Sequence, residues 1–353
     1  MALTPQQRSL YEKLLNTHVL MEDIHELLKK YKDNNKEIIR LSGSKGDLIE
    51  NILDAVSHSI VHITEVQALI KDAEEYGDQH IFLYNLINPN ILGHLNNGEN
   101  LANKILPLGI LQTFPRIMDQ PQQLEWGDFR YPNRGITNSW NMKLYDAKFR
   151  EVKQNDNFDS NTYIRTVTYK REETRLIYVL EWNGQSELEF KISRSTFDSR
   201  KGLQGSVGQI MRAVDAGGQG VVLHNNFEKT DLTTCIKNFF LNSSTNQDIF
   251  KLLSATFKDS HGGVAIFKSE NDQGDDDLLS EESRKEALEA YINDGDSRGI
   301  GLVIRFLAEG SGGILKSDIN VAIGRDEINH ITISAKIKPQ EYKYVRRKIE
   351  EFN

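Results

Sequence analysis

The stretch that most constrains the fold is 175–240, where the spacing of apolar residues changes several times within one run of sequence. Alternating apolar and polar residues predict antiparallel strands at Leu176–Glu181 and Glu187–Ser193. Asn183-Gly184 between them is typical of a tight two-residue hairpin turn. A basic loop, a helix, a short buried strand at Val221–Leu223 and a second helix capped by Thr230 are expected to follow. This order predicts an α/β domain in the middle of the chain.

The spacing of apolar residues also divides the rest of the chain into segments. Apolar residues recur at helical spacing in the N-terminal part, including a short helix expected at His80–Leu86, and at a spacing of two near the C-terminus. Five of the seven prolines fall between Pro89 and Pro132, which favours short helical turns there, and many aromatic residues favour packing onto a neighbour. We therefore expect an α+β protein with a helical module at 1–87, an aromatic- and proline-rich connector at 88–160, a central α/β domain with antiparallel strands at 161–270, an acidic loop and helix at 271–298, and a small β-rich C-terminal domain at 299–353.

Charge and cysteine content narrow the classes of function. The net charge of −8 argues against a protein coated in basic surface, although a local basic patch depends only on where the charges lie. The single cysteine, Cys235, excludes an internal disulfide and a cysteine-rich zinc site. No apolar run approaches the roughly 20 residues of a membrane span. The first residues lack a signal-peptide core, so we expect a cytoplasmic or nuclear protein that is neither secreted nor held in a membrane.

The segment Leu41–Leu53, LSGSKGDLIENIL, places a glycine- and lysine-containing turn before an amphipathic helix. Ser44 and Asp47 have capping-box spacing, so Ser44 is the expected N-cap. An apolar helix, then Gly-x-Lys, then a helix with Leu-Ile resembles the SAP or HeH family of DNA-binding motifs. The resemblance covers about residues 24–56 and implies that Lys45 contacts DNA phosphates. The acidic residues of the second helix leave open a plain capped helical hairpin.

The order of the chain suggests another relative. A helical N-terminus followed by an antiparallel sheet also resembles the centromere protein N family of kinetochore subunits. This resemblance implies a non-catalytic protein–protein adaptor. The aromatic connector and the acidic loop at Asp272–Asp277 would then contact a protein partner.

An acid and a lysine lie two residues apart on the second predicted strand, at Glu189 and Lys191, so both side chains share one face. A hairpin, a helix and a further strand around Glu-x-Lys resemble the PD-(D/E)xK nuclease superfamily over residues 163–240. The resemblance implies that Glu189 binds Mg²⁺ and that Lys191 orients or activates the attacking water. Glu181 on the preceding strand points to the opposite face, so a second metal-binding acid is not evident. A solvated strand face with a charge pair is the other interpretation.

Cations gather after this strand. Arg194, Arg200 and Lys201 lie in or next to a loop with several glycines, and Arg212 follows on the next helix. Glycines let backbone amides approach a phosphate, and the N-terminus of a helix favours anions. The pattern predicts contact with nucleic-acid phosphates that is independent of base sequence and sensitive to salt. A flexible charged loop without a ligand would have the same composition.

The sequence is therefore consistent with three functions. We expect a DNA-binding subunit of a DNA-handling or antiviral defence assembly, with a nuclease-like and inactive core, which contacts phosphates through these cations and Lys191. The first alternative is an active Mg²⁺-dependent endonuclease of the PD-(D/E)xK type, which would use Glu189 and Lys191. The second alternative is the kinetochore-like adaptor, which needs neither a metal nor a nucleic acid.

Overall fold

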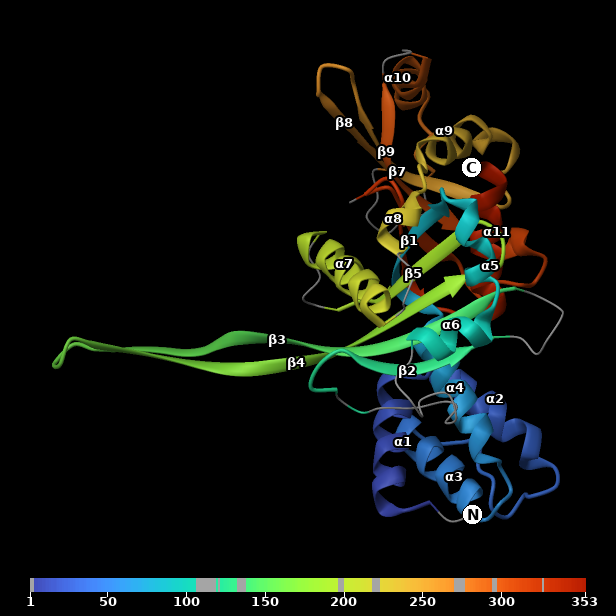
Figure 1. The fold of residues 1–353 in the computed structure, drawn as a ribbon, viewed down its shortest axis with the longest axis vertical. Coiled ribbons are helices and arrows are strands. Elements are labelled where there is room, and N and C mark those ends of the chain that lie inside the picture. The colour runs from blue at the N-terminus through green and yellow to red at the C-terminus, as the bar shows by residue number, and fades with distance from the viewer. Residues whose placement is uncertain are drawn as a thin grey trace. The chain divides into compact units, whose positions relative to one another are not determined.

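The computed structural model describes residues 3–105, 119, 121–131, 138–195, 200–217, 223–269, 277–293, 297–325 and 327–353, without the side chains of some residues at helix ends, Arg200 and Lys201 among them. The protein is α+β, with antiparallel strand pairing throughout the pairs described (Figure 1). It divides into two compact units: unit 1 is 1–89, 186–191 and 225–353, and unit 2 is 90–185 and 192–224. Each unit is therefore assembled from separate stretches of sequence.

Unit 1 begins with four helices, α1 (Pro5–His18), α2 (Met21–Lys32), α3 (Lys45–Ser57) and α4 (Ile63–Glu75). Each helix buries an apolar face, and α3 packs against α1 and α2. The cap expected at Ser44 is confirmed, because its side chain accepts a hydrogen bond from the Asp47 N–H. Asp47 in turn accepts one from the Ser44 N–H at 2.7 Å. This capping box fixes the start of α3.

The sheet of unit 1 gathers strands from both ends of the chain. Its strands are β1 (Gly77–Leu86), β5 (Glu187–Ser193), β6 (Phe227–Lys229), β7 (Phe250–Lys258), β8 (Val264–Lys268), β9 (Arg298–Phe306), β10 (Ile319–Ile323) and β11 (His330–Lys336). The other elements of unit 1 are α9 (Thr233–Leu241), η3 (Ser243–Thr245), α10 (Glu282–Asn293), η4 (Glu309–Ser311) and α11 (Pro339–Phe352). Two short helices, η1 (Pro89–Ile91) and α8 (Leu223–Asn226), contain residues of both units. The order β5-β1-β11-β10-β9-β7-β8 places the N-terminal strand beside the last one, and β6 also pairs with β1. The segment 299–353 thus shares one unit with the N-terminal helices.

The helix predicted at His80–Leu86 is wrong, because these residues belong to β1. Ile81 pairs with Ile331 of β11, and both are fully buried. A short apolar run does not distinguish a strand from a buried helix, and here the pairing partners on either side decide.

The core beside the sheet is filled by α9 and α11, where the Phe239 and Phe352 rings stack with centroids 4.2 Å apart.

Unit 2 consists of α5 (Leu92–Leu95), α6 (Gly98–Ile105), β2 (Glu125–Arg130), β3 (Trp140–Asp159), β4 (Ile164–Trp182) and α7 (Arg200–Gly217). The connector expected at 88–160 therefore holds two strands besides its short helices. Within it the Trp140 indole N–H donates to the Leu95 carbonyl at 3.0 Å, whereas packing onto a neighbouring domain stays a prediction. β2 pairs with β3 only as far as Tyr145. Beyond that point β3 and β4 continue as a long two-stranded ribbon (Figure 1).

Local signals were partly misleading. The loop between Trp182 and Glu187 has four residues instead of two, and within it the Asn183 side chain accepts a hydrogen bond from the Gln185 N–H at 2.9 Å. Thr230 does not cap α9, whose N-cap is Leu232 without a side-chain bond. Most of the strand predicted at 221–223 and of the acidic loop at 272–277 lies outside the described residues. None of the described helices is long and apolar enough to cross a membrane.

Candidate nucleic-acid interface

The Glu-x-Lys pair lies on one face of β5, as its spacing predicts. The Lys191 ammonium is 3.4 Å from a Glu189 carboxylate oxygen. Both side chains are buried, with exposed fractions of 8% for Glu189 and 1% for Lys191. Leu188 and Phe190 are buried on the other face of the strand. β5 is therefore an interior strand, and the solvated face considered above is not present.

Helix α11 covers the charged face of β5. Tyr342 Oη donates to Glu189 Oε2 at 2.8 Å, and Arg346 Nε donates to Glu189 Oε1. Arg346 Nη2 also donates to Glu187 Oε1 at 2.6 Å. Tyr342 and Arg346 share one face of α11 because they are four residues apart, and that face contacts the acidic residues on one face of β5. We call Glu187, Glu189, Lys191, Tyr342 and Arg346 the buried charge cluster.

Lys191 is held by rings as well as by charge. Its ammonium lies 4.2 Å from the centroid of the Tyr342 ring and 4.9 Å from that of Tyr76. Cation–π contacts of this kind stabilise a lysine that has lost its water. Because the ammonium is enclosed, it does not reach a phosphate at the surface, and Lys191 has a structural role in this arrangement.

The ionisation of the cluster follows from competing effects. Burial alone would raise the pKa of Glu189, but the charges of Arg346 and Lys191 and the bonds to its oxygens hold that pKa below its usual value. Burial raises the pKa of Glu187 against the opposing charge of Arg346. Burial also disfavours the charged form of Arg346, yet Glu189 and Glu187 raise its pKa above the usual value. Glu189 and Arg346 are therefore a buried ion pair.

The cluster does not fit the Mg²⁺ that the nuclease resemblance implies. Mg²⁺ is bound by carboxylate oxygens together with several waters. Here the two carboxylate oxygens of Glu189 already bond Arg346 and Tyr342. In the part of the chain that the structure describes, no three His, Cys, Asp or Glu side chains are grouped to hold a metal. We derive no catalytic step from Glu189 or Lys191.

Lys45, the residue carried over from the SAP-like motif, lies at the C-terminal end of α1. Its ammonium donates to the Asn16 carbonyl at 2.5 Å, and Lys336 donates to the neighbouring Thr17 and His18 carbonyls at 2.8 and 2.9 Å. Two lysines thus bind the negative end of one helix. Burial, and then the charge of Lys336, lower the pKa of Lys45.

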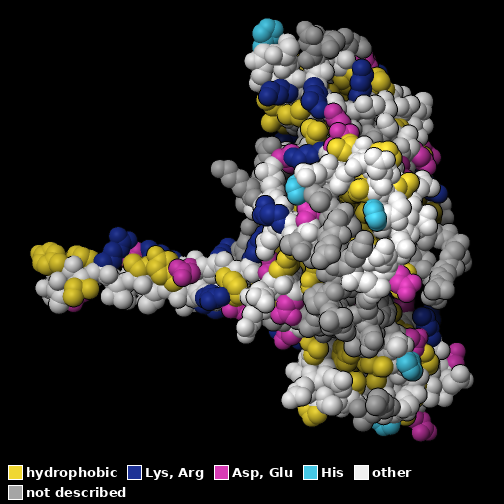
Figure 2. Space-filling model, in the orientation of Figure 1, with side chains coloured by type: hydrophobic (Ala, Val, Ile, Leu, Met, Phe, Trp, Pro, Cys, Tyr) yellow, Lys and Arg dark blue, Asp and Glu magenta, His cyan; other side chains and the backbone are white. Residues whose placement is uncertain are grey.

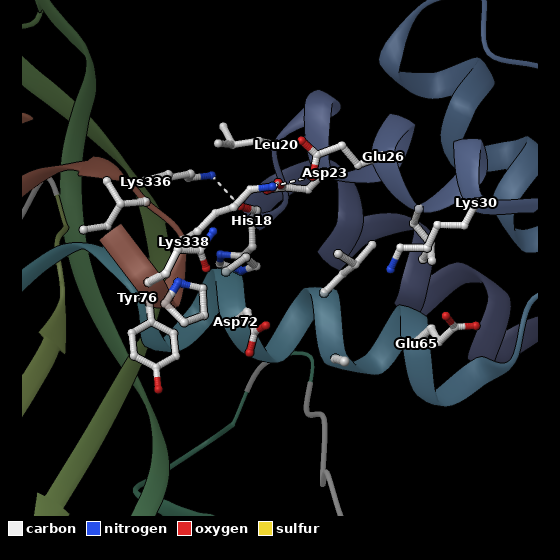
Figure 3. A pocket seen from close by; sticks show the side chains of 17 residues that line it. His18, Leu20, Asp23, Glu26, Lys30, Glu65, Asp72, Tyr76, Lys336 and Lys338 are labelled. Atoms are coloured by element: carbon white, nitrogen blue, oxygen red, sulfur yellow. Dashed lines mark hydrogen bonds and ion pairs between the residues drawn. The ribbon is translucent and has the colours of Figure 1, made fainter. Parts of the chain in front are cut away.

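A cavity of about 380 Å³ opens beside this contact, between α2, α4 and the segment that leads into α11 (Figure 3). Two of its acidic side chains are paired with one lysine: Lys338 lies 3.0 Å from Asp23 and also bonds Glu26. Hydrogen bonds from Lys316 and Lys338 lower the pKa of Glu26 to about 2. The lysines of the cavity therefore hold the helical module to the end of β11, and we assign no ligand to it.

The remaining predicted cations belong to unit 2. Arg194 and Arg212 are exposed, whereas the side chains of Arg200 and Lys201 lie outside the described residues. Arg212 extends along α7 toward the helix start, because a Cβ built on Gly208 would lie 3.6 Å from its guanidinium. A Cβ at Gly205, one turn earlier, would meet nothing within 4 Å. The surface of α7 at Gly205 is therefore unobstructed, and the exposed Arg212 lies further along the same helix.

Charge differs in sign between the units. Unit 2 contains 16 Lys and Arg residues against 13 Asp and Glu residues, a net charge of +3. The remainder of the chain has 27 against 38, a net charge of −11. The overall negative charge thus belongs to unit 1, and the four predicted cations after β5 lie in the positive unit.

Sequence reasoning missed the partners of Glu189. Tyr342 and Arg346 lie more than 150 residues away in the chain. The available signal was the spacing of four between them, which places both on one face of the predicted terminal helix. That spacing does not reveal which strand the helix covers.

Comparison with known proteins adds no relative. No protein-family model matches this chain, and no curated protein matches it at a significant level.

Proposed function

We propose that this chain is a non-catalytic nucleic-acid-binding protein whose interface lies on unit 2. The observation that carries the proposal is the segregation of charge: unit 2 is positive within a chain that is negative overall. Nucleic-acid affinity comes largely from neutralising phosphates with Lys and Arg, so the positive unit is the one that a polyanion approaches. DNA is the partner to test first.

Helix α7 supports this placement. It has 18 residues, and its first turn contains Arg200 and Lys201 with no acidic residue. Cations at the positive end of a helix are unfavourable on their own, and a bound phosphate would offset that cost. Gly205 and Gly208 leave room for a phosphate backbone to approach the helix near Arg212. These features favour contact with the backbone of DNA over readout of its bases.

The endonuclease alternative has less support. It needs a carboxylate that is free to bind Mg²⁺, and both oxygens of Glu189 are bonded within the buried charge cluster. A metal ion bound to Glu189 would also take from the buried Arg346 guanidinium one of its two buried carboxylate partners, which is unfavourable for a charge removed from water.

The test is a variant in which Arg194, Arg200, Lys201 and Arg212 are all alanine. Binding to a duplex DNA of random sequence is measured between 50 and 300 mM salt by fluorescence anisotropy. Each lost phosphate contact lowers the slope of log K against log salt by about 0.9, so we expect the slope to fall by about three to four.

The matched control replaces four exposed lysines of unit 1, Lys36, Lys237, Lys258 and Lys268, by alanine. It changes the net charge by the same amount, and we expect the wild-type slope. If the two variants lose affinity equally, the effect is one of total charge and the assignment to unit 2 fails. If neither loses affinity, these cations do not contact DNA.

A further inference from the structure

The ribbon formed by 148–159 of β3 and 164–174 of β4 carries an unusual amount of exposed aromatic surface. Phe149, Phe158, Tyr163 and Tyr169 have exposed fractions of 41%, 60%, 82% and 58%. Figure 2 shows hydrophobic side chains at the end of the ribbon and again part-way along it, with basic side chains between them. A two-stranded hairpin is marginally stable by itself in water, so a covering partner would stabilise this one.

These aromatic residues share one face of the ribbon. Along that face the directly opposed pairs are Phe149 with Glu173, Glu151 with Arg171, Lys153 with Tyr169, Asp156 with Val167, and Phe158 with Arg165. The contacts agree with this register, because Arg171 lies 3.7 Å above the Phe149 ring and Phe158 meets Tyr163 edge-on at 6.3 Å. We call these residues, with Tyr163, the aromatic face.

The charges of the aromatic face balance one another. Arg165 and Lys153 both bond Asp156, and Arg171 lies 3.5 Å from Glu173. A surface without net charge gives phosphates little attraction, unlike the cations after β5. Exposed aromatic residues interleaved with arginine are typical of protein–protein contact surfaces.

The register of the aromatic face is symmetric about its middle pair, Lys153 with Tyr169. Glu173 and Arg165 both lie four residues from Tyr169 along β4, and their partners on β3 are Phe149 and Phe158. A two-fold axis through the middle pair, across the strands, would therefore place Phe149 over Phe158 of a second copy. The same rotation places Glu173 over Arg165 of that copy, so rings meet rings and opposite charges meet.

Two oppositions in this arrangement are between like charges, because Lys153, which lies on the axis, would also face Lys153 of the second copy. Glu151 would face Asp156 of the second copy, but Lys153 lies at the centre and already bonds Asp156 in its own chain. The acids would then share the two central lysines. The alternative axis, along the strands, would place Glu151 over Arg171 but Phe149 over Glu173, so that no ring would meet a ring.

From this symmetry we infer that the aromatic face is a self-association surface, covered by a second copy of this chain in antiparallel orientation. Because aromatic side chains bury about 150–250 Å² each, the exposed parts of the four rings supply roughly 400–500 Å² per copy. With the flanking charged residues the total passes the ~1,000 Å² that a specific interface needs. The inference stands apart from nucleic-acid binding, since it uses none of the four cations after β5.

The first test is the mass of the full chain in solution, measured by sedimentation equilibrium between 1 and 100 µM. We expect a dimer, and we expect Phe158→Ser to raise the dissociation constant at least tenfold. Ile164→Ser is the matched control, since Ile164 is also 60% exposed at the end of the ribbon but belongs to the other face. It should leave the mass unchanged.

The second test reverses the proposed ion pair. Arg165→Glu and Glu173→Arg each place like charges opposite one another twice per dimer, and each should weaken association about tenfold. The double variant restores opposite charges between the copies and should associate more tightly than either single variant, although it still lacks the ion pairs that Arg165 and Glu173 make within their own chain. The four-alanine variant of the cations after β5 should still dimerise, which separates this surface from the DNA interface.

A wild-type chain that stays monomeric at 100 µM overturns the inference. So does a double variant that is no better than the single ones, because the two residues would then not face each other. A monomer whose DNA affinity falls on Phe158→Ser would also overturn it, and would mean that the rings stack on bases.

Discussion

At the scale of single residues, the protein shows how a correct sequence pattern can mislead about chemistry. Glu189 and Lys191 do share one face of a strand, and their charged groups lie 3.4 Å apart. Strand geometry alone sets that proximity, so the sequence sufficed to predict it. Arg346 and Tyr342, which decide what the pair does, arrive through long-range packing of α11 that no local pattern encodes.

The first prediction concerns Arg346→Met. Removing the guanidinium leaves Glu187 and Glu189 buried without their main counter-charge, so we expect a loss of about 3–5 kcal/mol in the free energy of unfolding. Urea unfolding at pH 8 measures it. A companion variant with Glu187→Gln and Glu189→Gln added should be more stable than the single variant. A loss below about 1 kcal/mol would mean that the buried charge cluster contributes little.

The same variant should respond to pH. In the wild type the pKa of Glu189 is lowered, so its contribution to stability is present above the unfolded value of 4.5 and is lost as pH falls toward the folded value. Without Arg346, burial would dominate and raise the Glu189 pKa. The deficit of Arg346→Met should therefore shrink between pH 8 and pH 5, as protonation removes the buried charge. A deficit that does not change with pH would contradict this account.

At the scale of elements, the sequence predicted a helix start correctly where the capping residues are neighbours in the chain. Ser44 and Asp47 lie three apart and cap α3 reciprocally, so the sequence was enough. β1 was missed because its four central apolar residues suit either a helix or a strand, and β11 and β6 decide between them. The ribbon was foreseen only in part, since β3 falls in a segment that was expected to be a connector.

A second prediction follows because Ser44 caps α3, whereas Thr230 does not cap α9. Ser44→Ala should cost about 1 kcal/mol, because it removes the acceptor at the start of α3. Thr230→Val should cost close to nothing, since the buried Thr230 hydroxyl has no hydrogen-bond partner among the described residues. Both are measured by thermal or urea unfolding. Equal losses for the two substitutions would contradict the assignment of caps.

At the scale of the whole molecule, the sequence predicted the class of fold but not its partition. The α+β class follows from the change of hydrophobic period along the chain. The units do not follow, because unit 1 joins the N-terminal helices, part of β5 and the C-terminal third of the chain. Once the units are known, the net charge of −8 separates into a positive and a negative part.

The central claim, that DNA is bound by unit 2, can be tested most directly by mapping its contacts. The full chain is cross-linked by ultraviolet light to a bromouracil-containing duplex, and the cross-linked peptides are identified by mass spectrometry. We predict cross-links within 90–185 and 192–224, concentrated near Arg194 and α7. Cross-links confined to residues 24–56, as the SAP-like resemblance implies, or to other parts of unit 1 would contradict the account.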